Sequence, residues 1–205
     1  VLIGDSHTQQ WADVVGHVAR TRFYQTLMFP GCYEQCSEFE GRLVTILKTL
    51  TPEVIITSGK LYTPLYVYEK TSMVESWLWR QKSFIELLSP YTKSWLVIGD
   101  TPELILHVPD CLSQNEEDIT RCGQTRELST SRAFQTAEKQ MVEELARVRG
   151  QNITYVDPTL WLCGEWCPPV RGGLILYRDD NHISISASYA YTTKVRAVLD
   201  PLLGR

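Results

Sequence analysis

The sequence predicts an α/β domain of three layers, in which helices cover both faces of a central parallel sheet. Three observations lead to this prediction: short apolar runs alternate with helical patterns, turn residues separate them, and the 205 residues suffice for one core. Hydrophobic residues make up 43% of the chain, so folding can bury about 70% of the unfolded surface. This composition excludes an intrinsically disordered chain.

Six apolar runs have the length and composition of strands, in the order Val1–Ile3, Phe23–Phe29, Glu53–Thr57, Ser94–Gly99, Asn152–Val156 and, as a shorter extended piece, Leu174–Tyr177. Apolar residues at helical spacing predict helices at Trp11–Val18, Phe39–Leu50, Ser72–Leu88, Leu128–Arg149 and Ser184–Leu203. Strands joined by helices imply right-handed crossovers and therefore a parallel sheet. Sites in such sheets lie beyond the carboxyl ends of the strands.

The chain contains no internal repeat and no Gly/Ser linker, so we expect residues 1–205 to form a single domain. Val1 lies in a predicted buried strand without an initiator methionine or signal sequence, and we therefore expect a fragment of a larger protein. The loop-rich stretch Asp100–Gly123 is long for an ordinary connection. It is expected to be a binding or cover element pinned by its two cysteines.

The charge of the chain argues against binding to nucleic acid or anionic lipid, and its hydropathy argues against a membrane-spanning helix. The formal net charge is -4 and the isoelectric point is about 5.6, so no global field attracts nucleic acid or anionic lipid. The longest apolar runs, such as Trp95–Ile98, fall far short of the ~20 residues that a membrane-spanning helix requires.

Six cysteines fall in local pairs, namely Cys32 and Cys36, Cys111 and Cys122, and Cys163 and Cys167. Three short-range disulfides in an oxidising compartment are the favoured interpretation. The alternatives are a zinc site built from the two C-x-x-x-C pairs, and six unpaired thiols in a reducing compartment. Zinc pairs more often have C-x-x-C spacing, which favours disulfides over metal.

A serine stands at the first predicted turn, in Gly4-Asp5-Ser6-His7, between a buried strand and the next helix. A hydroxyl at this place lies at the carboxyl edge of the sheet, where a nucleophile would meet its substrate. The unpaired N–H groups of the helix start, that of Ser6 among them, can stabilise an oxyanion. Alone, however, the serine is equally explained as a helix N-cap.

A second polar motif, Asp179-Asp180-Asn181-His182, precedes the last predicted helix. Residues i and i+3 share one side of a turn, so Asp179 can accept a hydrogen bond from one nitrogen of His182 while the other nitrogen faces Ser6. These three residue types supply a nucleophile, its base and the group that orients the base. A solvated turn with a helix cap is the alternative interpretation of this motif.

Together, the two motifs resemble the first and last sequence blocks of the SGNH (GDSL-like) hydrolase superfamily. The resemblance implies a three-layer α/β/α flavodoxin-like fold and a catalytic triad of Ser6, His182 and Asp179. The closer similarity is to SGNH domains fused to bacterial acyltransferase-3 membrane proteins, because Cys163 and Cys167 precede the block Leu176–Ser184. Those domains face outward from the inner membrane and take part in the O-acylation of surface glycans.

One feature departs from the family pattern, in which a glycine after the second strand and an asparagine after the third complete the oxyanion hole. Gly31 stands at the first place, but the chain reads Ser58-Gly59-Lys60-Leu61 after the third strand and lacks the asparagine. Loss of such a donor costs about two to three orders of magnitude in rate. Four explanations of the missing asparagine are open. The N–H of Gly59 or of a nearby residue replaces it as the oxyanion donor, or a partner protein supplies the donor. Alternatively, the enzyme is slow, or this segment is a plain loop without a role in the oxyanion hole.

The resemblance implies an extracytoplasmic O-acyltransferase domain that moves an acyl group, expected to be acetyl, to a glycan hydroxyl through an acyl-Ser6 intermediate. Its partners would be an acyl donor, a carbohydrate acceptor and a membrane acyltransferase domain in the same parent chain, with no nucleic acid, metal or cofactor. A carbohydrate acetylesterase shares the chemistry and remains an alternative. A non-catalytic glycan-binding module is a further alternative, favoured by the missing asparagine.

Overall fold

A computed structural model describes residues 1–31, 36–60 and 70–203 of the chain, which contain a central parallel sheet of five strands. The strands are β1 (Leu2–Gly4), β2 (Met28–Pro30), β3 (Val54–Ser58), β4 (Ser94–Ile98) and β6 (Asn152–Val156). Their order, β2-β1-β3-β4-β6, is the flavodoxin-like order of a doubly wound sheet. The predicted three-layer α/β/α fold is thereby confirmed.

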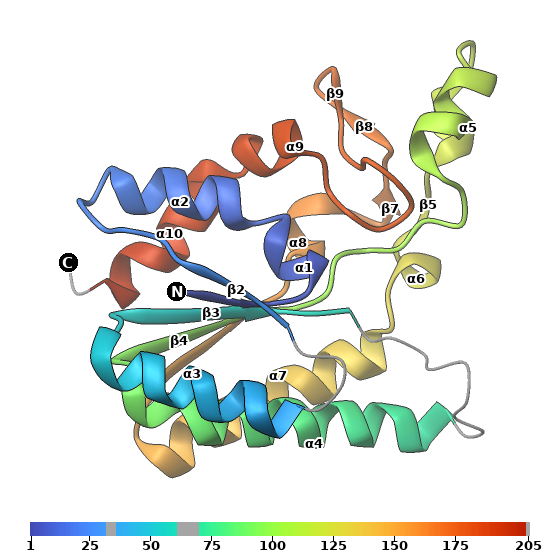
Figure 1. The fold of residues 1–205 in the computed structure, drawn as a ribbon. Helices are drawn as coiled ribbons and strands as arrows, with labels where there is room; N and C mark the ends of the chain where they lie inside the picture. The colour runs from blue at the N-terminus through green and yellow to red at the C-terminus, as the bar shows by residue number, and fades with distance from the viewer. Residues whose placement is uncertain (32–35, 61–69, 204–205) are drawn as a thin grey trace.

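Helices cover both faces of the sheet, as Figure 1 shows. On one face lie α2 (Ala12–Arg20), α9 (Ile185–Ala190) and α10 (Thr192–Leu202); on the other lie α3 (Cys36–Leu50), α4 (Lys70–Leu88) and α7 (Arg132–Arg149). Neighbouring residues of a strand therefore enter different cores. Trp95 packs on the α3 side and Leu96 on the α2 side, and both are buried.

The second strand is shorter than the predicted Phe23–Phe29, because β2 begins only at Met28 and ends at Pro30, one residue beyond the predicted end. Phe23 has a positive φ of 64° and is 92% exposed, so the chain turns there instead of running extended. As an edge strand with one neighbour, β2 needs little length to fix its place beside β1.

Two long predicted helices are each divided. Within Leu128–Arg149, Thr130 is extended, and the Ser131 hydroxyl caps α7 by accepting from the Phe134 N–H at 3.3 Å. Within Ser184–Leu203, Tyr191 ends α9 and precedes α10. Each break leaves a short helix near the carboxyl edge of the sheet and a longer one on its face.

The stretch Asp100–Gly123 contains more regular structure than expected, with α5 (Val108–Gln114) followed by the 3-10 helix η2 (Ile119–Cys122). A disulfide between Cys111 and Cys122 joins the two, with their Cα atoms 5.7 Å apart. The remaining short elements are α1 (Ser6–Gln9), η1 (Ser89–Tyr91), β5 (Gln124–Thr125), α6 (Arg126–Ser129), α8 (Thr159–Leu162), β7 (Trp166–Cys167), β8 (Val170–Arg171) and β9 (Leu174–Ile175).

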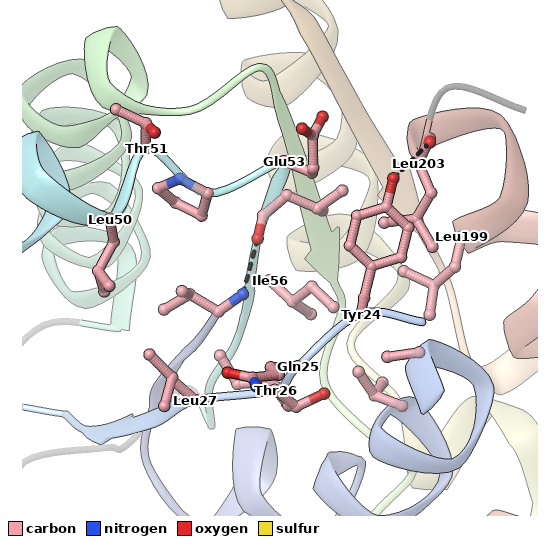
Figure 2. A pocket seen from close by; sticks show the side chains of 16 residues that line it. Tyr24, Gln25, Thr26, Leu27, Leu50, Thr51, Glu53, Ile56, Leu199 and Leu203 are labelled. Atoms are coloured by element: carbon pink, nitrogen blue, oxygen red, sulfur yellow. Dashed lines mark hydrogen bonds between the residues drawn. The ribbon is translucent and has the colours of Figure 1, made fainter. Parts of the chain in front are cut away.

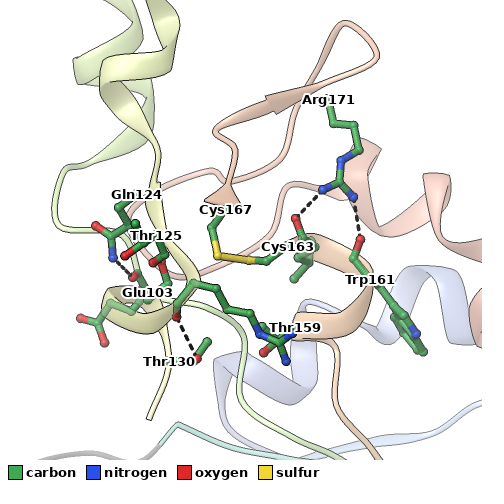
Figure 3. Close-up of a disulfide and its surroundings, with 12 residues drawn as sticks. Glu103, Gln124, Thr125, Thr130, Thr159, Trp161, Cys163, Cys167 and Arg171 are labelled. Atoms are coloured by element: carbon green, nitrogen blue, oxygen red, sulfur yellow. Dashed lines mark hydrogen bonds between the residues drawn. A yellow bond between two sulfur atoms is a disulfide. The ribbon is translucent and has the colours of Figure 1, made fainter. Parts of the chain in front are cut away.

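The second described disulfide, Cys163–Cys167, links the end of α8 to β7 (Figure 3). Close to it, the Arg171 guanidinium donates to the carbonyl oxygens of Trp161 and Leu162 at 2.7 and 2.8 Å, which ties the β8–β9 hairpin to α8. Two of the three predicted cysteine pairs are thus confirmed as disulfides, and the C-x-x-x-C pair described here is not a metal-ligand pair. The pair of Cys32 and Cys36 lies outside the side chains described.

A cavity of about 280 Å³ opens at the amino edge of the sheet, where Leu27, Glu53 and Val54 begin or precede their strands (Figure 2). Tyr24 lines this cavity, and its hydroxyl donates a hydrogen bond to the Leu203 carbonyl oxygen at 3.1 Å. This cavity is at the opposite edge from the motif Gly4-Asp5-Ser6-His7, which begins at the last residue of β1. In the described ranges, none of the helices combines the length and apolar character that a bilayer crossing requires.

Candidate active site

The turn after β1 places Ser6 at the first position of α1, and its neighbours fix the turn. The Asp5 side chain caps the helix, with Oδ1 accepting from the His7 N–H at 2.8 Å and Oδ2 accepting from the Lys60 N–H at 3.1 Å. Gly4 has a φ of +155°, and a Cβ there would lie 2.6 Å from the Ser58 carbonyl oxygen. Only glycine therefore fits before the Asp5-Ser6 turn.

The loop that carries His182 is closed by an antiparallel bridge between Tyr177 and Ile183. Inside this loop, Asp179 Oδ1 accepts from the backbone N–H groups of His182 and Asn181 at 2.6 and 2.9 Å. Its other oxygen, Oδ2, lies 2.7 Å from His182 Nδ1. The i, i+3 spacing thus gives the contact that the sequence predicted.

The two ends of the chain meet at this place, because His182 Nε2 lies 2.7 Å from Ser6 Oγ. Ser6, His182 and Asp179 therefore form one hydrogen-bonded line, although Ser6 and His182 are 176 residues apart in the sequence. With Nδ1 donating to the carboxylate, Nε2 is free to accept the serine proton. The His182 side chain is 17% exposed, so it is accessible from solvent.

The environment of Asp179 favours its ionised form. Burial raises the pKa of this carboxyl, but hydrogen bonds from the N–H groups of His182 and Asn181, and from the His182 ring, outweigh it and hold the pKa below its usual value. An ionised Asp179 stabilises a positive charge on His182 during proton transfer. This arrangement can deprotonate a serine hydroxyl and return the proton to a leaving group.

Among protein families, the model for "SGNH domain (fused to AT3 domains)" matches residues 1–197. This chain belongs to that family. No curated protein sequence matches it in a direct search. The family assignment rests on a match over residues 1–197 of the 205 residues and not on one motif.

Solved structures share the fold of this SGNH domain at low sequence identity. The periplasmic domain of a lipopolysaccharide acetyltransferase from Salmonella ser. Paratyphi A has a TM-score of 0.63 and 15% identity, covering 97% of this chain and 82% of that one. A putative acylhydrolase from Bacteroides fragilis gives 0.56 and 11%, covering 98% and 86%. An acetylxylan esterase from Geobacillus stearothermophilus, in a catalytic mutant form, gives 0.53 and 12%, covering 99% and 92%.

The structure corrects the expected role of Gly31 in the SGNH domain. Its N–H donates to the Gly4 carbonyl oxygen at 2.6 Å, as part of the β1–β2 pairing, and is therefore engaged in the sheet. A Cβ on Gly31 would lie 3.0 Å from the Gly4 carbonyl carbon and 3.2 Å from the Asp5 nitrogen. Gly31 is thus needed for close packing against the Ser6 turn, and not as a free oxyanion donor.

Two other N–H groups at this edge are available. Within the described residues, neither the Ser6 N–H nor the Gly59 N–H has a hydrogen-bond acceptor. Gly59 packs under Trp77, since a Cβ there would lie 2.8 Å from Trp77 Cη2. Leu61, which stands where the family pattern has its asparagine, lies outside the described residues.

Three polar residues beside the triad were not predicted from the sequence. His7 is completely buried. Its Nδ1 lies 2.8 Å from Asp100 Oδ1, and its ring centroid lies 4.5 Å from that of His182. Gln10 and Thr101 are also buried and reach the backbone of the His182 loop. No pattern in the sequence marks Gln10 or Thr101, because their partners are backbone atoms far away in sequence.

Proposed function

We propose that this SGNH domain is the extracytoplasmic part of a serine-dependent O-acyltransferase that moves an acyl group, acetyl in the simplest case, to a glycan hydroxyl. The observation that supports this proposal most strongly is the line from Ser6 Oγ through the His182 ring to Asp179, with 2.7 Å at each step. The domain would be one part of a longer membrane protein, as the fusion to AT3 domains in its family suggests.

In the first half of the reaction, His182 Nε2 takes the proton of the Ser6 hydroxyl while Ser6 Oγ attacks the carbonyl carbon of the acyl donor. The tetrahedral intermediate then expels the donor's leaving group, which receives the proton from His182. An acyl-Ser6 ester remains. Asp179 stays ionised throughout and stabilises the imidazolium that forms between these two proton transfers.

In the second half, a sugar hydroxyl of the acceptor gives its proton to His182 and attacks the acyl-Ser6 carbonyl. Ser6 Oγ leaves and recovers its proton from His182, so the enzyme returns to its starting state with an O-acylated sugar as product. We assign the oxyanion contacts to the N–H groups of Ser6 and Gly59, which have no acceptor among the described residues.

The location outside the cytoplasm is supported by the two disulfides, Cys111–Cys122 and Cys163–Cys167, because such bonds persist in oxidising compartments. The solved acetyltransferase domain with the same fold is itself described as periplasmic. A carbohydrate substrate is supported by the same set of structures, since one is described as acting on lipopolysaccharide and another on acetylxylan.

A second candidate function, carbohydrate acetylesterase, is favoured by the acetylxylan esterases that share the fold. In that case water replaces the sugar hydroxyl in the second half of the reaction. The two functions are separated by supplying a small acetyl ester as donor with and without oligosaccharide acceptors, and measuring O-acetylated sugar by mass spectrometry. Acetylated sugar at the expense of free acetate supports transfer, whereas acetate alone supports hydrolysis.

The nucleophile is tested by treating the protein with a fluorophosphonate and measuring the intact mass. We expect one covalent adduct, located on Ser6 by peptide mapping, and no adduct on the Ser6→Ala variant. The control is Ser113→Ala, because the Ser113 hydroxyl lies on the exposed side of α5 and donates only to the Asp110 carbonyl oxygen. A folded protein without an adduct would favour a non-catalytic glycan-binding module.

A further inference from the structure

The loop that carries His182 is held by side chains from two other parts of the chain. Thr101, which follows β4, donates from its hydroxyl to the Asn181 carbonyl oxygen at 2.7 Å. Gln10, at the end of α1, accepts from the Ile183 N–H through Oε1 at 2.7 Å. The backbone is therefore fixed immediately before and immediately after His182.

The two side chains are also joined to each other. Gln10 Nε2 lies 3.4 Å from Thr101 Oγ1 and donates to the His7 carbonyl oxygen at 3.2 Å. Thr101 Oγ1 lies 3.3 Å from His7 Nδ1. The Thr101 hydroxyl thus donates to Asn181 and accepts from Gln10, and its second acceptor site faces His7 Nδ1.

Burial makes this arrangement rigid. Gln10 is 8% exposed and Thr101 is 5% exposed, so water does not compete for their hydrogen bonds. An unsatisfied buried polar group is costly, which means that each group keeps its assigned partner.

Gln10 also connects the base to the nucleophile. It caps α1, the helix that begins with Ser6, and its N–H donates to the Ser6 carbonyl oxygen at 3.0 Å. Gln10 thus joins the Ser6 helix, through its backbone, to the His182 loop, through its side chain. Proton transfer between Ser6 Oγ and His182 Nε2 depends on this relation, because general-base catalysis requires hydrogen-bond distance between the two atoms.

We propose that Gln10 and Thr101 are positioning residues, which hold His182 in line with Ser6 by fixing the backbone on either side of the ring. The proposal rests on the proposed function for its kinetic consequence, but its structural consequence can be measured separately. Neither residue contacts substrate in this role; both act through His182.

The test uses Gln10→Met and Thr101→Val, which keep the approximate volume and remove the hydrogen bonds, together with Thr101→Ser, which keeps the hydroxyl. The matched controls are Gln135→Met and Thr159→Val. Gln135 Nε2 donates to Thr159 Oγ1 at 2.8 Å, both residues are buried, and neither hydrogen-bonds to the His182 loop. The controls therefore remove an equivalent buried pair elsewhere.

Two readouts are measured for each variant, at matched temperature below its unfolding midpoint. The first is the downfield proton resonance of His182 Nδ1–H, which reports the hydrogen bond to Asp179 without any turnover. The second is kcat and KM for a small acetyl ester. We expect Gln10→Met and Thr101→Val to broaden or lose the resonance and to lower kcat about 10- to 100-fold at similar KM. Thr101→Ser and both controls should retain the wild-type values.

The outcomes separate the two proposals. A wild-type protein that is inactive and forms no fluorophosphonate adduct would contradict the proposed function. The His182 resonance would still report on the positioning of the ring. An unchanged resonance and kcat in Gln10→Met and Thr101→Val would overturn the positioning role. Equal losses in the controls would overturn it too, because they would indicate a general effect of buried hydrogen bonds. If Thr101→Val does not fold, Gln10→Met and Thr101→Ser decide by the same criteria.

Discussion

At the scale of single residues, both oxygens of Asp179 have defined partners. Oδ1 accepts from two backbone N–H groups and orients the carboxylate, while Oδ2 accepts from His182 Nδ1. The carboxylate is thereby held in place independently of the ring. It follows that a substitution at Asp179 can change the chemistry of His182 while the loop keeps part of its structure.

Asp179→Asn is expected to lower kcat by about three to four orders of magnitude, because an amide that donates to Nδ1 selects the wrong imidazole tautomer and does not stabilise the imidazolium. The measurement is the initial rate of hydrolysis of a small acetyl ester. The control is Asp180→Asn, because the Asp180 carboxylate accepts from the Asn181 side chain at 2.8 Å and not from His182. Comparable losses in the two variants would refute the assigned role of Asp179.

Residue-scale predictions from the sequence succeed where a motif encodes a local contact. Asp179 and His182 are three residues apart, so their contact follows from the geometry of a turn, and the family resemblance adds Ser6. The use of the Gly31 N–H depends instead on the register of β1 and β2, which the sequence does not specify. For this reason Gly31 could be predicted to follow the second strand, while the hydrogen bond from its N–H to Gly4 could not be predicted.

At the scale of elements, α7 contributes a buried carboxyl group to the interface with α4 and β6. Glu138 is 1% exposed, and it accepts from Gln81 Nε2 at 2.9 Å and from the Tyr155 hydroxyl at 3.0 Å. Burial raises the pKa of Glu138 to about 7, because the ionised form is poorly solvated there and these hydrogen bonds compensate only in part.

The stability of the domain is therefore expected to fall as pH rises. In the unfolded chain Glu138 ionises near its ordinary pKa of 4.5, while in the folded protein it ionises near 7. Between these values the unfolded state binds fewer protons, so the free energy of unfolding decreases with pH. The stability that the protonated Glu138 gives the folded state is fully present below pH about 4.5 and lost above pH about 7. Over this range the free energy of unfolding is expected to fall by about 3 kcal/mol.

Urea unfolding between pH 4.5 and 8 tests this prediction with Glu138→Gln, which has nearly the same shape and does not ionise. Its Oε1 can still accept from Gln81 Nε2, while its Nε2 would donate to the Tyr155 hydroxyl oxygen, which reverses the direction of that hydrogen bond. We expect the variant to lack most of the decline and to exceed the wild type in stability at pH 8. Glu143→Gln serves as the control, since Glu143 lies on the exposed face of the same helix. Parallel pH profiles for wild type and Glu138→Gln would show that this carboxyl is not responsible.

The elements that the sequence predicted correctly are those with a strong apolar signal. The strands β3 and β4 are buried at every position, and their continuous apolar runs lie within one residue of the predicted bounds. Helix breaks were missed because they depend on single residues: Ser131 caps α7, and Tyr191 ends α9. Apolar periodicity continues across such breaks, so it predicts one helix where two form.

At the scale of the whole molecule, the described disulfides lie in the segments that surround the carboxyl edge of the sheet. Cys111–Cys122 secures α5, whose preceding segment donates from the Leu104 N–H to the Asp180 carbonyl oxygen at 2.7 Å. Cys163–Cys167 secures the segment before the β8–β9 hairpin, which leads directly into the His182 loop. Both crosslinks therefore restrict chain segments that support the site.

Reduction of these disulfides is expected to destabilise the domain. Loop-closure entropy gives about 3 kcal/mol for a separation of 11 residues and about 2 kcal/mol for a separation of 4. Their sum is comparable to the roughly 5–15 kcal/mol by which small domains are stable, so a reduced chain would be close to unfolding. The measurement is urea unfolding with and without a phosphine reductant, which should lower the midpoint strongly.

The control is a variant with alanine at Cys111, Cys122, Cys163 and Cys167, which should start with the low midpoint and no longer respond to the reductant through these pairs. Any response that persists in this variant reports on Cys32 and Cys36, and would indicate that the third predicted pair is also oxidised. A wild-type midpoint that is insensitive to the reductant would contradict the stabilising role of the crosslinks. It would also remove their support for a location in an oxidising compartment, because a domain that folds equally well when reduced has no need of one.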